Sequence, residues 1–149
     1  MESNLGPGLS HPESIPSQYQ AELWKFDVAE FFLSDPITGH YLEFNLSPNG
    51  AWWTCGFSGV LEAANQEPSS VPGVETFGEE FEHSWRAHAS FPLAWLEEHY
   101  HFGSNSRINA TFILNSPDQI FLTAAPPSEG EPNFHQPDLF PRMEFISLA

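Results

Sequence analysis

The segment His40–Gly59, HYLEFNLSPNGAWWTCGFSG, decides the fold of this chain because it encodes a complete β-hairpin. In its first half Tyr41, Glu43 and Asn45 alternate with apolar residues, which is the two-residue period of a strand. The Ser-Pro-Asn-Gly sequence that follows is a chain reversal, and Gly50 is free to adopt a positive φ there. The sequence therefore predicts two antiparallel strands joined by a short turn.

The return strand of this hairpin begins with two adjacent tryptophans, Trp52 and Trp53. Neighbouring residues in a strand point to opposite faces of the sheet. One indole can therefore fill the core, while the other faces solvent or a ligand. The sequence does not decide which tryptophan faces outward.

The rest of the chain predicts an all-β, antiparallel β-sandwich, jelly-roll or immunoglobulin-like, with one short helix. Fourteen Pro and ten Gly divide the 149 residues into short elements, as is typical of such folds. A turn is expected at residues 35–39, and residues 61–78 are expected to form a long loop. We expect residues 1–20 to be a flexible arm and residues 21–149 to be one domain. Further strands are predicted at residues 23–33, 79–91, 107–114, 120–125 and 143–147, and a short helix at residues 92–98.

The charge of the chain excludes several classes of partner. Twenty Asp and Glu residues against four Lys and Arg residues give a net charge of −16, which disfavours nucleic acid and anionic membranes. The carboxylates permit a Ca²⁺ site, although the EF-hand spacing is absent. Cys55 is the single cysteine, so it can form no intrachain disulfide. Residues 1–18 lack the basic segment and the apolar segment of a secretion signal, so we expect a cytoplasmic protein. The sequence does not decide its oligomeric state.

Three stretches together resemble the family 9 carbohydrate-binding-module-like proteins, also described as DOMON-like domains. They are LWKFDVAEFFL at residues 23–33, YLEFNLSPNGAWW at 41–53 and NFHQPDLF at 133–140. The likeness extends over residues 23–145. It implies a β-sandwich that binds sugars or, in related branches, haem.

The hairpin also carries the candidate ligand site. Carbohydrates are recognised by flat aromatic faces together with amide and carboxylate groups. Glu43, Asn45 and Tyr41 share one face of a strand, and Trp52 or Trp53 stands beside them. This predicts a non-catalytic module for a saccharide or similar small ligand. In the alternative interpretation, the three residues are only a solvated sheet face and both indoles pack inside.

Other sites suggested by the sequence involve histidines. His99 and His101 would lie on one side of an extended segment and could share a metal ion, although a third ligand is needed. Haem would need axial ligands, for which Met143, His135 and the same histidine pair are available. Trp24, Trp85 and Trp95 are expected in the core.

Two further interpretations stay open at this stage. Glu30 and Glu43 could lie on adjacent strands, and paired carboxylates can hydrolyse glycosides. No nucleotide-binding, serine-hydrolase or zinc-protease motif accompanies them, so the sequence favours a module without catalytic activity. An open sheet edge could instead bind another protein.

Overall fold

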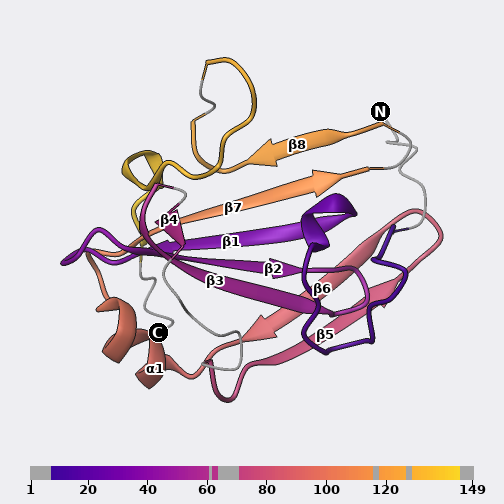
Figure 1. The fold of residues 1–149 in the computed structure, drawn as a ribbon, viewed down its shortest axis with the longest axis horizontal. Helices are drawn as coiled ribbons and strands as arrows, with labels where there is room; N and C mark the ends of the chain where they lie inside the picture. Colours follow the sequence, from indigo (N-terminus) through magenta and orange to yellow (C-terminus); the bar gives the residue numbers. More distant parts are fainter. Residues whose placement is uncertain (1–7, 61, 64–70, 116–117, 127–128, 145–149) are drawn as a thin grey trace.

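The computed structural model describes residues 8–60, 62–63, 71–115, 118–126 and 129–144. Within these residues the chain forms an antiparallel β-sandwich with one short α-helix, as the sequence predicts (Figure 1). The strands are β1 (Val28–Ser34), β2 (Tyr41–Leu46), β3 (Trp52–Gly59), β4 (Glu62–Ala63), β5 (Glu75–Glu80), β6 (Trp85–Ser90), β7 (Arg107–Leu114) and β8 (Ile120–Thr123). The helices of the described residues are α1 (Leu93–Tyr100) and the 3₁₀-helices Leu23–Lys25 and Pro137–Leu139.

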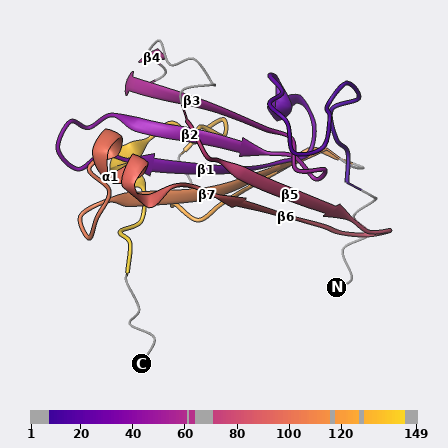
Figure 2. The same cartoon turned by 90° about the horizontal axis from the view of Figure 1, so that it is seen from below.

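The larger sheet has β1 and β2 at its centre. Its strand order is β4-β3-β2-β1-β7-β8, and every neighbouring pair is antiparallel. In the central register Phe32 of β1 lies between Glu43 of β2 and Asn109 of β7. β5 and β6 form a separate hairpin that lies as a second layer across one face of the larger sheet (Figure 2).

The β2–β3 hairpin forms as the sequence predicts. The Ser47 carbonyl accepts a hydrogen bond from the Gly50 N–H at 2.9 Å, and Gly50 has a φ of 83°. The register pairs Asn45 with Trp53 and Leu46 with Trp52. Directly paired residues share a face, so Trp53 lies on the same face as Asn45 and Trp52 lies on the other.

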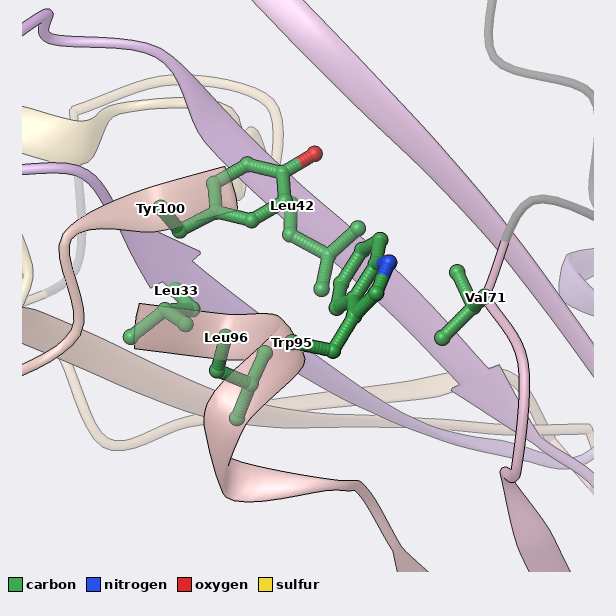
Figure 3. Close-up of a cluster of buried hydrophobic side chains, with 6 residues drawn as sticks. All are labelled: Leu33, Leu42, Val71, Trp95, Leu96 and Tyr100. Carbon is green, nitrogen blue, oxygen red and sulfur yellow. The ribbon is translucent and has the colours of Figure 1, made fainter. Parts of the chain in front are cut away.

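One face of the larger sheet, here called the helix face, packs against α1 and the β5–β6 hairpin. Leu33 and Leu42 form a buried cluster with Trp95, Leu96 and Tyr100 of α1, with Val71 beside them (Figure 3). Phe44 lies edge-on to Phe91 at 4.6 Å between ring centroids. Burying one such aromatic side chain contributes roughly 1.5–3 kcal/mol to stability.

The opposite face carries Glu30, Glu43, Asn45 and Trp53 and is here called the carboxylate face. Apolar clusters cover this face at its two ends. At one end Leu23 packs with Val28 and Ile113, and at the other Phe140 packs on Phe32 and Tyr41. The polar residues lie between these two clusters.

The predicted strand at residues 23–33 begins later than expected. Leu23–Lys25 is a 3₁₀-helix, entered through Glu22 in the left-handed conformation, and the strand starts at Val28. The prediction of one strand over residues 79–91 is also wrong in part. Residues 81–84 form a turn, in which the Phe81 N–H donates to the Ser84 carbonyl, and this turn separates β5 from β6. β5 therefore occupies the end of the predicted 61–78 loop.

The other local predictions agree with the structure where it describes them. The turn at residues 35–39, the helix after Pro92 and the β7–β8 hairpin are confirmed. Of residues 143–147, only 143 and 144 lie within the described part, and neither belongs to a strand there. Among the described residues, no helix has the length and apolar character needed to cross a membrane.

Residues 8–20 lie against the sandwich. The Leu9 N–H donates to the Asp27 carboxylate at 3.0 Å, and Tyr19 forms a parallel bridge with Trp52 of β3. The backbone of Gln20 donates to the Trp52 carbonyl at 2.9 Å. The division into an arm and a single domain stays a prediction.

Candidate functional site

A pocket of about 350 Å³ opens on the carboxylate face, between the two apolar clusters. Its volume lies in the range typical of small-molecule sites. Its lining residues are Trp24, Glu30, Glu43, Trp53, Phe57, Ile113, Phe121, Pro132, Asn133, Phe134 and His135. The pocket thus combines aromatic walls with a polar floor.

Two tryptophans form one wall of the pocket. The 3₁₀-helix Leu23–Lys25 buries Leu23 completely and leaves Trp24 40% exposed. Trp24 lies edge-on to Trp53 of β3, with 5.5 Å between the ring centroids. Side chains of the segments after β7 and before the Pro137–Leu139 helix face them, and Phe121 and Phe134 of those segments lie 6.1 Å apart.

Two buried carboxyl groups form the floor. Glu30 lies on β1 and Glu43 on β2, so the alternation of both strands places them on the same face. The Thr111 hydroxyl donates to Glu30 Oε2 at 2.8 Å. Burial raises the pKa of Glu30 to about 7, against the opposing effect of this hydrogen bond.

The pKa of Glu43 is raised further above its ordinary value than that of Glu30. Burial and, after it, the charge of Glu30 raise the pKa of Glu43 to about 8. Asn45 lies near enough to oppose this shift, although the geometry of a hydrogen bond is not met. At neutral pH the floor of the pocket therefore contains protonated carboxylic acid, which can both donate and accept a hydrogen bond.

His135 closes the pocket beside Glu43. Its Nδ1 shares a hydrogen bond of 2.9 Å with the Tyr41 hydroxyl, and its Nε2 lies 3.6 Å from Glu43 Oε2. Burial lowers the pKa of His135. Because the pKa of Glu43 is raised and that of His135 is lowered, their contact joins a neutral acid and a neutral imidazole rather than two ions.

Asn45 is buried without a partner between these groups. It pairs across the sheet with Glu30 on one side and Trp53 on the other, and it is fully buried. Neither its amide nitrogen nor its amide oxygen has a hydrogen-bond partner among the described residues. Such a group costs free energy when left unsatisfied, and it marks a place where a ligand or water supplies the missing bonds.

The structure brings together three of the five residues proposed from the sequence. Glu43 and Trp53 line the pocket, and Asn45 lies in the register between Trp53 and Glu30. Tyr41 shares their face, but it is buried under His135 and stacks on Phe57 at 4.8 Å.

Trp52 faces away from this pocket. On the helix face it stacks on Phe44, with 5.7 Å between centroids and 15° between ring planes. Tyr19 of the N-terminal segment packs edge-on against it. The adjacent tryptophans therefore serve opposite faces of the sheet, and the register assigns Trp53 to the pocket.

Several pocket residues were not proposed as ligand-binding from the sequence. The prediction that Trp24, Trp85 and Trp95 lie in the core is confirmed for Trp95, which is buried, whereas Trp85 is half-buried and Trp24 is exposed. Glu30 carried a usable signal, because a carboxylate inside an apolar central strand is unusual. His135, by contrast, reaches the pocket through a tertiary contact that no local pattern predicts.

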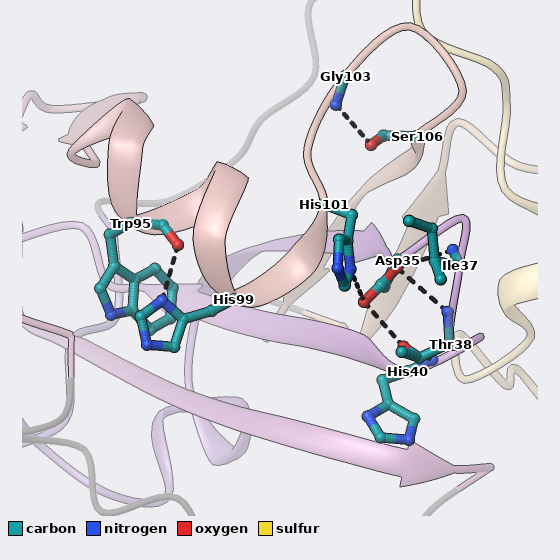
Figure 4. Close-up of polar contacts among 9 residues, drawn as sticks. All are labelled: Asp35, Ile37, Thr38, His40, Trp95, His99, His101, Gly103 and Ser106. Carbon is teal, nitrogen blue, oxygen red and sulfur yellow. Dashed lines mark hydrogen bonds and ion pairs between the residues drawn. The ribbon is translucent and has the colours of Figure 1, made fainter.

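His99 and His101 do not come together. His99 lies in the last turn of α1, where its ring stacks on Trp95 at 4.6 Å, whereas His101 turns to the Asp35 carboxylate at 2.9 Å (Figure 4). The segment is helical rather than extended, so the expected shared side does not exist. In the described part of the chain, no group of three His, Cys, Asp or Glu residues is arranged to hold a metal ion.

The suggested haem ligands are also separated. Met143 packs against the α1 cluster on the helix face, whereas His135 lines the pocket on the carboxylate face. Both ring nitrogens of His135 face protein groups, Tyr41 and Glu43. The structure thus offers no haem pocket built from these residues.

Comparison with known proteins supports the fold. No protein family and no curated protein matches the chain in sequence. A crystal structure of a "putative carbohydrate-binding protein" from Bacteroides uniformis ATCC 8492 superposes with a TM-score of 0.65 at 21% sequence identity. The match covers 91% of this chain and 66% of that protein, so this chain spans just under two thirds of its length.

Proposed function

We propose that this chain is a non-catalytic binding module that holds a carbohydrate, or a similar polyol, in the pocket on the carboxylate face. The observation that carries the proposal is the joining of the Trp24–Trp53 wall to a buried floor of Glu30 and Glu43. Behind this floor the fully buried Asn45 amide has no hydrogen-bond partner among the described residues. The name of the Bacteroides uniformis protein points in the same direction.

The chemistry of the pocket suits a neutral, hydroxyl-rich ligand. Aromatic faces pack against the apolar C–H surface of a sugar ring, and the ring hydroxyls need groups that donate and accept hydrogen bonds. The Asn45 amide and a protonated Glu43 supply both. Because they carry no charge at neutral pH, they bind hydroxyls without desolvating a buried ion.

Below neutral pH the same carboxyl groups do not form the charge pair of a glycoside hydrolase. A hydrolase of this kind needs one ionised carboxylate as nucleophile or base beside one protonated acid. Here burial raises the pKa of both Glu30 and Glu43, so neither is a ready base below neutral pH. We also propose that the chain is a module of the family 9 or DOMON-like kind, and that its ligand is a saccharide rather than haem.

Adjacent tryptophans provide a matched test. Titration calorimetry against a panel of mono- and oligosaccharides would identify a ligand, and the measurement would be repeated with Trp53→Ala and Trp52→Ala. We expect Trp53→Ala to weaken binding at least about tenfold, because stacking of an aromatic side chain is lost from the pocket wall. Trp52→Ala faces the other side of the sheet and should bind the sugar as the parent does, once circular dichroism shows that it is folded.

Two outcomes would contradict the proposal. Either no saccharide in the panel gives a saturable heat, or both variants bind the ligand equally well. Release of reducing ends from an oligosaccharide that binds would show instead that the module is an enzyme.

A further inference from the structure

We propose that a second, separate cleft on this molecule binds a small oxyanion such as a phosphate group. The cleft has a volume of about 650 Å³ and lies where the β1–β2 turn, the loop after α1 and residues 137–142 meet. Arg107, Arg142 and His101 line it, together with the polar residues Ser34, Ser104 and Asn105. None of these residues lines the proposed saccharide pocket.

The two arginines are paired in a backbone bridge. Arg107 begins β7, and Arg142 is its antiparallel partner in an isolated bridge. The bridge is fixed on both sides, by the Ile108 N–H on the Pro141 carbonyl at 3.0 Å and the Met143 N–H on the Ser106 carbonyl at 3.3 Å. Directly paired residues project to the same side, and like charges placed in this way destabilise each other.

No carboxylate of the described residues forms an ion pair with either arginine. Arg107 Nη1 donates to the Phe140 carbonyl at 3.0 Å, which carries no net charge. The chain has four Lys and Arg residues among twenty Asp and Glu residues, and the other two cations, Lys25 and Arg86, pair with Glu22 and Glu79. In so acidic a chain, two arginines that project to the same side of a bridge and have no ion-pair partner among the described residues indicate a site for an anion from outside the chain.

Asp35 fixes the position of His101 at the cleft. The Asp35 carboxylate accepts hydrogen bonds from the N–H groups of Ile37 and Thr38, from the Thr38 hydroxyl and from His101 Nδ1 (Figure 4). Burial alone would raise the pKa of Asp35, but these hydrogen bonds outweigh it and lower that pKa. Asp35 thus holds the His101 ring through Nδ1–H, and Nε2 has no partner among the described residues. In the neutral ring Nε2 is an acceptor, and it is a donor only when both ring nitrogens carry a proton.

An oxyanion matches this set of donors. Guanidinium groups bind phosphate and carboxylate oxygens through paired N–H donors. An imidazolium ring, which carries a proton on both nitrogens, would add a further N–H from His101. The lining also contains Asp138, whose carboxylate would repel an anion. Asp35 also keeps its negative charge, although its oxygens already accept four hydrogen bonds. Direct hydrogen bonds to the guanidinium groups, rather than the net charge of the cleft, would therefore hold the anion.

The test uses inorganic phosphate on the full chain. Thermal unfolding and calorimetry would be measured at fixed ionic strength, with phosphate replacing chloride, for the parent, Arg142→Gln and Arg86→Gln. Arg142 is exposed, and Arg86 is the control because it loses the same charge at a distant, paired position. We expect saturable stabilisation of the parent, at least about tenfold weaker phosphate binding in Arg142→Gln, and unchanged binding in Arg86→Gln.

A second measurement checks the charge argument. In chloride without phosphate, Arg142→Gln should unfold at a urea concentration equal to or higher than Arg86→Gln does. Both variants make this acidic chain more negative by one charge, but only Arg86→Gln also breaks an ion pair, with Glu79, whereas Arg142→Gln removes one of two paired arginines. A midpoint lower than that of Arg86→Gln would overturn the inference, as would a phosphate effect that is not saturable or is lost equally in both variants.

The source of the anion is distinguished by a sugar phosphate. Glucose 6-phosphate that binds at least about tenfold more tightly than inorganic phosphate, with dependence on Arg142, would identify a phosphorylated small molecule as the ligand. Equal affinities would identify free phosphate. Because the saccharide pocket shares none of these residues, failure of phosphate binding would leave the proposed function standing, and the reverse also holds.

Discussion

Glu43 lies at the centre of the larger sheet, where a carboxyl group is costly to ionise. Glu30, Asn45 and His135 lie near its polar end, and none of them offers a positive charge, because burial lowers the pKa of His135. The folded state therefore holds the proton of Glu43 far above the pH at which an unfolded chain releases it. This property links the pocket to the stability of the fold.

The first prediction is that stability falls as the pH rises. The pKa of Glu43 is about 8 in the folded state and 4.5 otherwise, and that of Glu30 is about 7. Between pH 4.5 and about 8 the unfolded chain loses protons that the folded chain keeps, so the free energy of unfolding decreases across this window. Urea unfolding at pH 5 and pH 8.5 should show this fall, at about 1.4 kcal/mol per unit of pKa difference as an upper bound.

Glu43→Gln tests the assignment of that effect. The glutamine amide has the shape of the protonated acid and cannot titrate, so the variant should lose less stability between the two pH values. Glu75→Gln, at an exposed position of β5, removes the same charge and should keep the parent's pH dependence. An equal slope in the parent and in Glu43→Gln would contradict the role given to Glu43.

The second prediction concerns Asn45, whose buried amide is unpartnered among the described residues. Asn45→Val removes that amide and places a β-branched residue in β2, so we expect unchanged or higher stability. The same change should weaken saccharide binding about tenfold or more, because a hydrogen-bonding pair to the ligand is lost. Urea unfolding measures the change in stability, and calorimetric titration of the same preparation measures the change in saccharide affinity. A loss of several kcal/mol in stability would contradict the prediction, because it would show that the Asn45 amide is hydrogen-bonded in the native state.

At the scale of elements, the contact between two hairpins fixes how the layers meet. The β2–β3 turn packs on β5 so closely that a Cβ at Gly78 would collide with backbone atoms of Pro48, Asn49 and Gly50. The Thr76 hydroxyl donates to the Gly50 carbonyl at 2.7 Å in the same place. The small hairpin is therefore anchored to the large sheet through backbone.

The third prediction is that Gly78→Ala destabilises the protein by about 1–3 kcal/mol, since backbone atoms must move to admit the methyl group. Gly103→Ala is the matched control, because the nearest atom to a Cβ there is 4.0 Å away. Chemical denaturation of the two variants compares them directly. Equal stability of Gly78→Ala and the parent would mean that the two hairpins do not approach as closely as described.

The elements that were predictable are those specified by local chemistry. The 40–59 hairpin contains its own turn and its own alternation, and the β7–β8 hairpin is similar in kind. The sequence does not predict β5, because its Thr-Phe-Gly core follows Pro and Gly, which are typical of loops. Gly78 also looks like a turn residue, whereas the structure needs it for close packing. The local sequence does not predict the Leu23–Lys25 helix either, because the burial of Leu23 and the exposure of Trp24 depend on contacts with β1, β3 and β7.

The candidate site was predictable only where it lies on the hairpin. Alternation placed Glu43 and Asn45 on one face, but choosing Trp53 over Trp52 required the register of the turn. His135 lies 94 residues from Tyr41 in sequence, and Trp24 meets Trp53 only after the sheet forms. Contacts of that kind depend on the whole fold and leave no periodic signal.

At the scale of the whole molecule, the charge of −16 opposes compactness. Four basic residues offset little of it, and two of them lie at the proposed oxyanion cleft. The repulsion acts between exposed carboxylates, so it is sensitive to screening, whereas the buried carboxyls of the pocket are screened much less.

The fourth prediction follows from this distinction. Raising NaCl from about 10 mM to about 300 mM, in a buffer without phosphate, should raise the melting temperature by about 2–4 °C, the shift that about 1 kcal/mol makes at this size. Glu75→Lys reverses one exposed charge and should raise the melting temperature at low salt, with the difference from the parent shrinking as salt is added. If salt changed neither protein, exposed carboxylate repulsion would not limit stability, and the pH dependence above would belong to the buried pair alone.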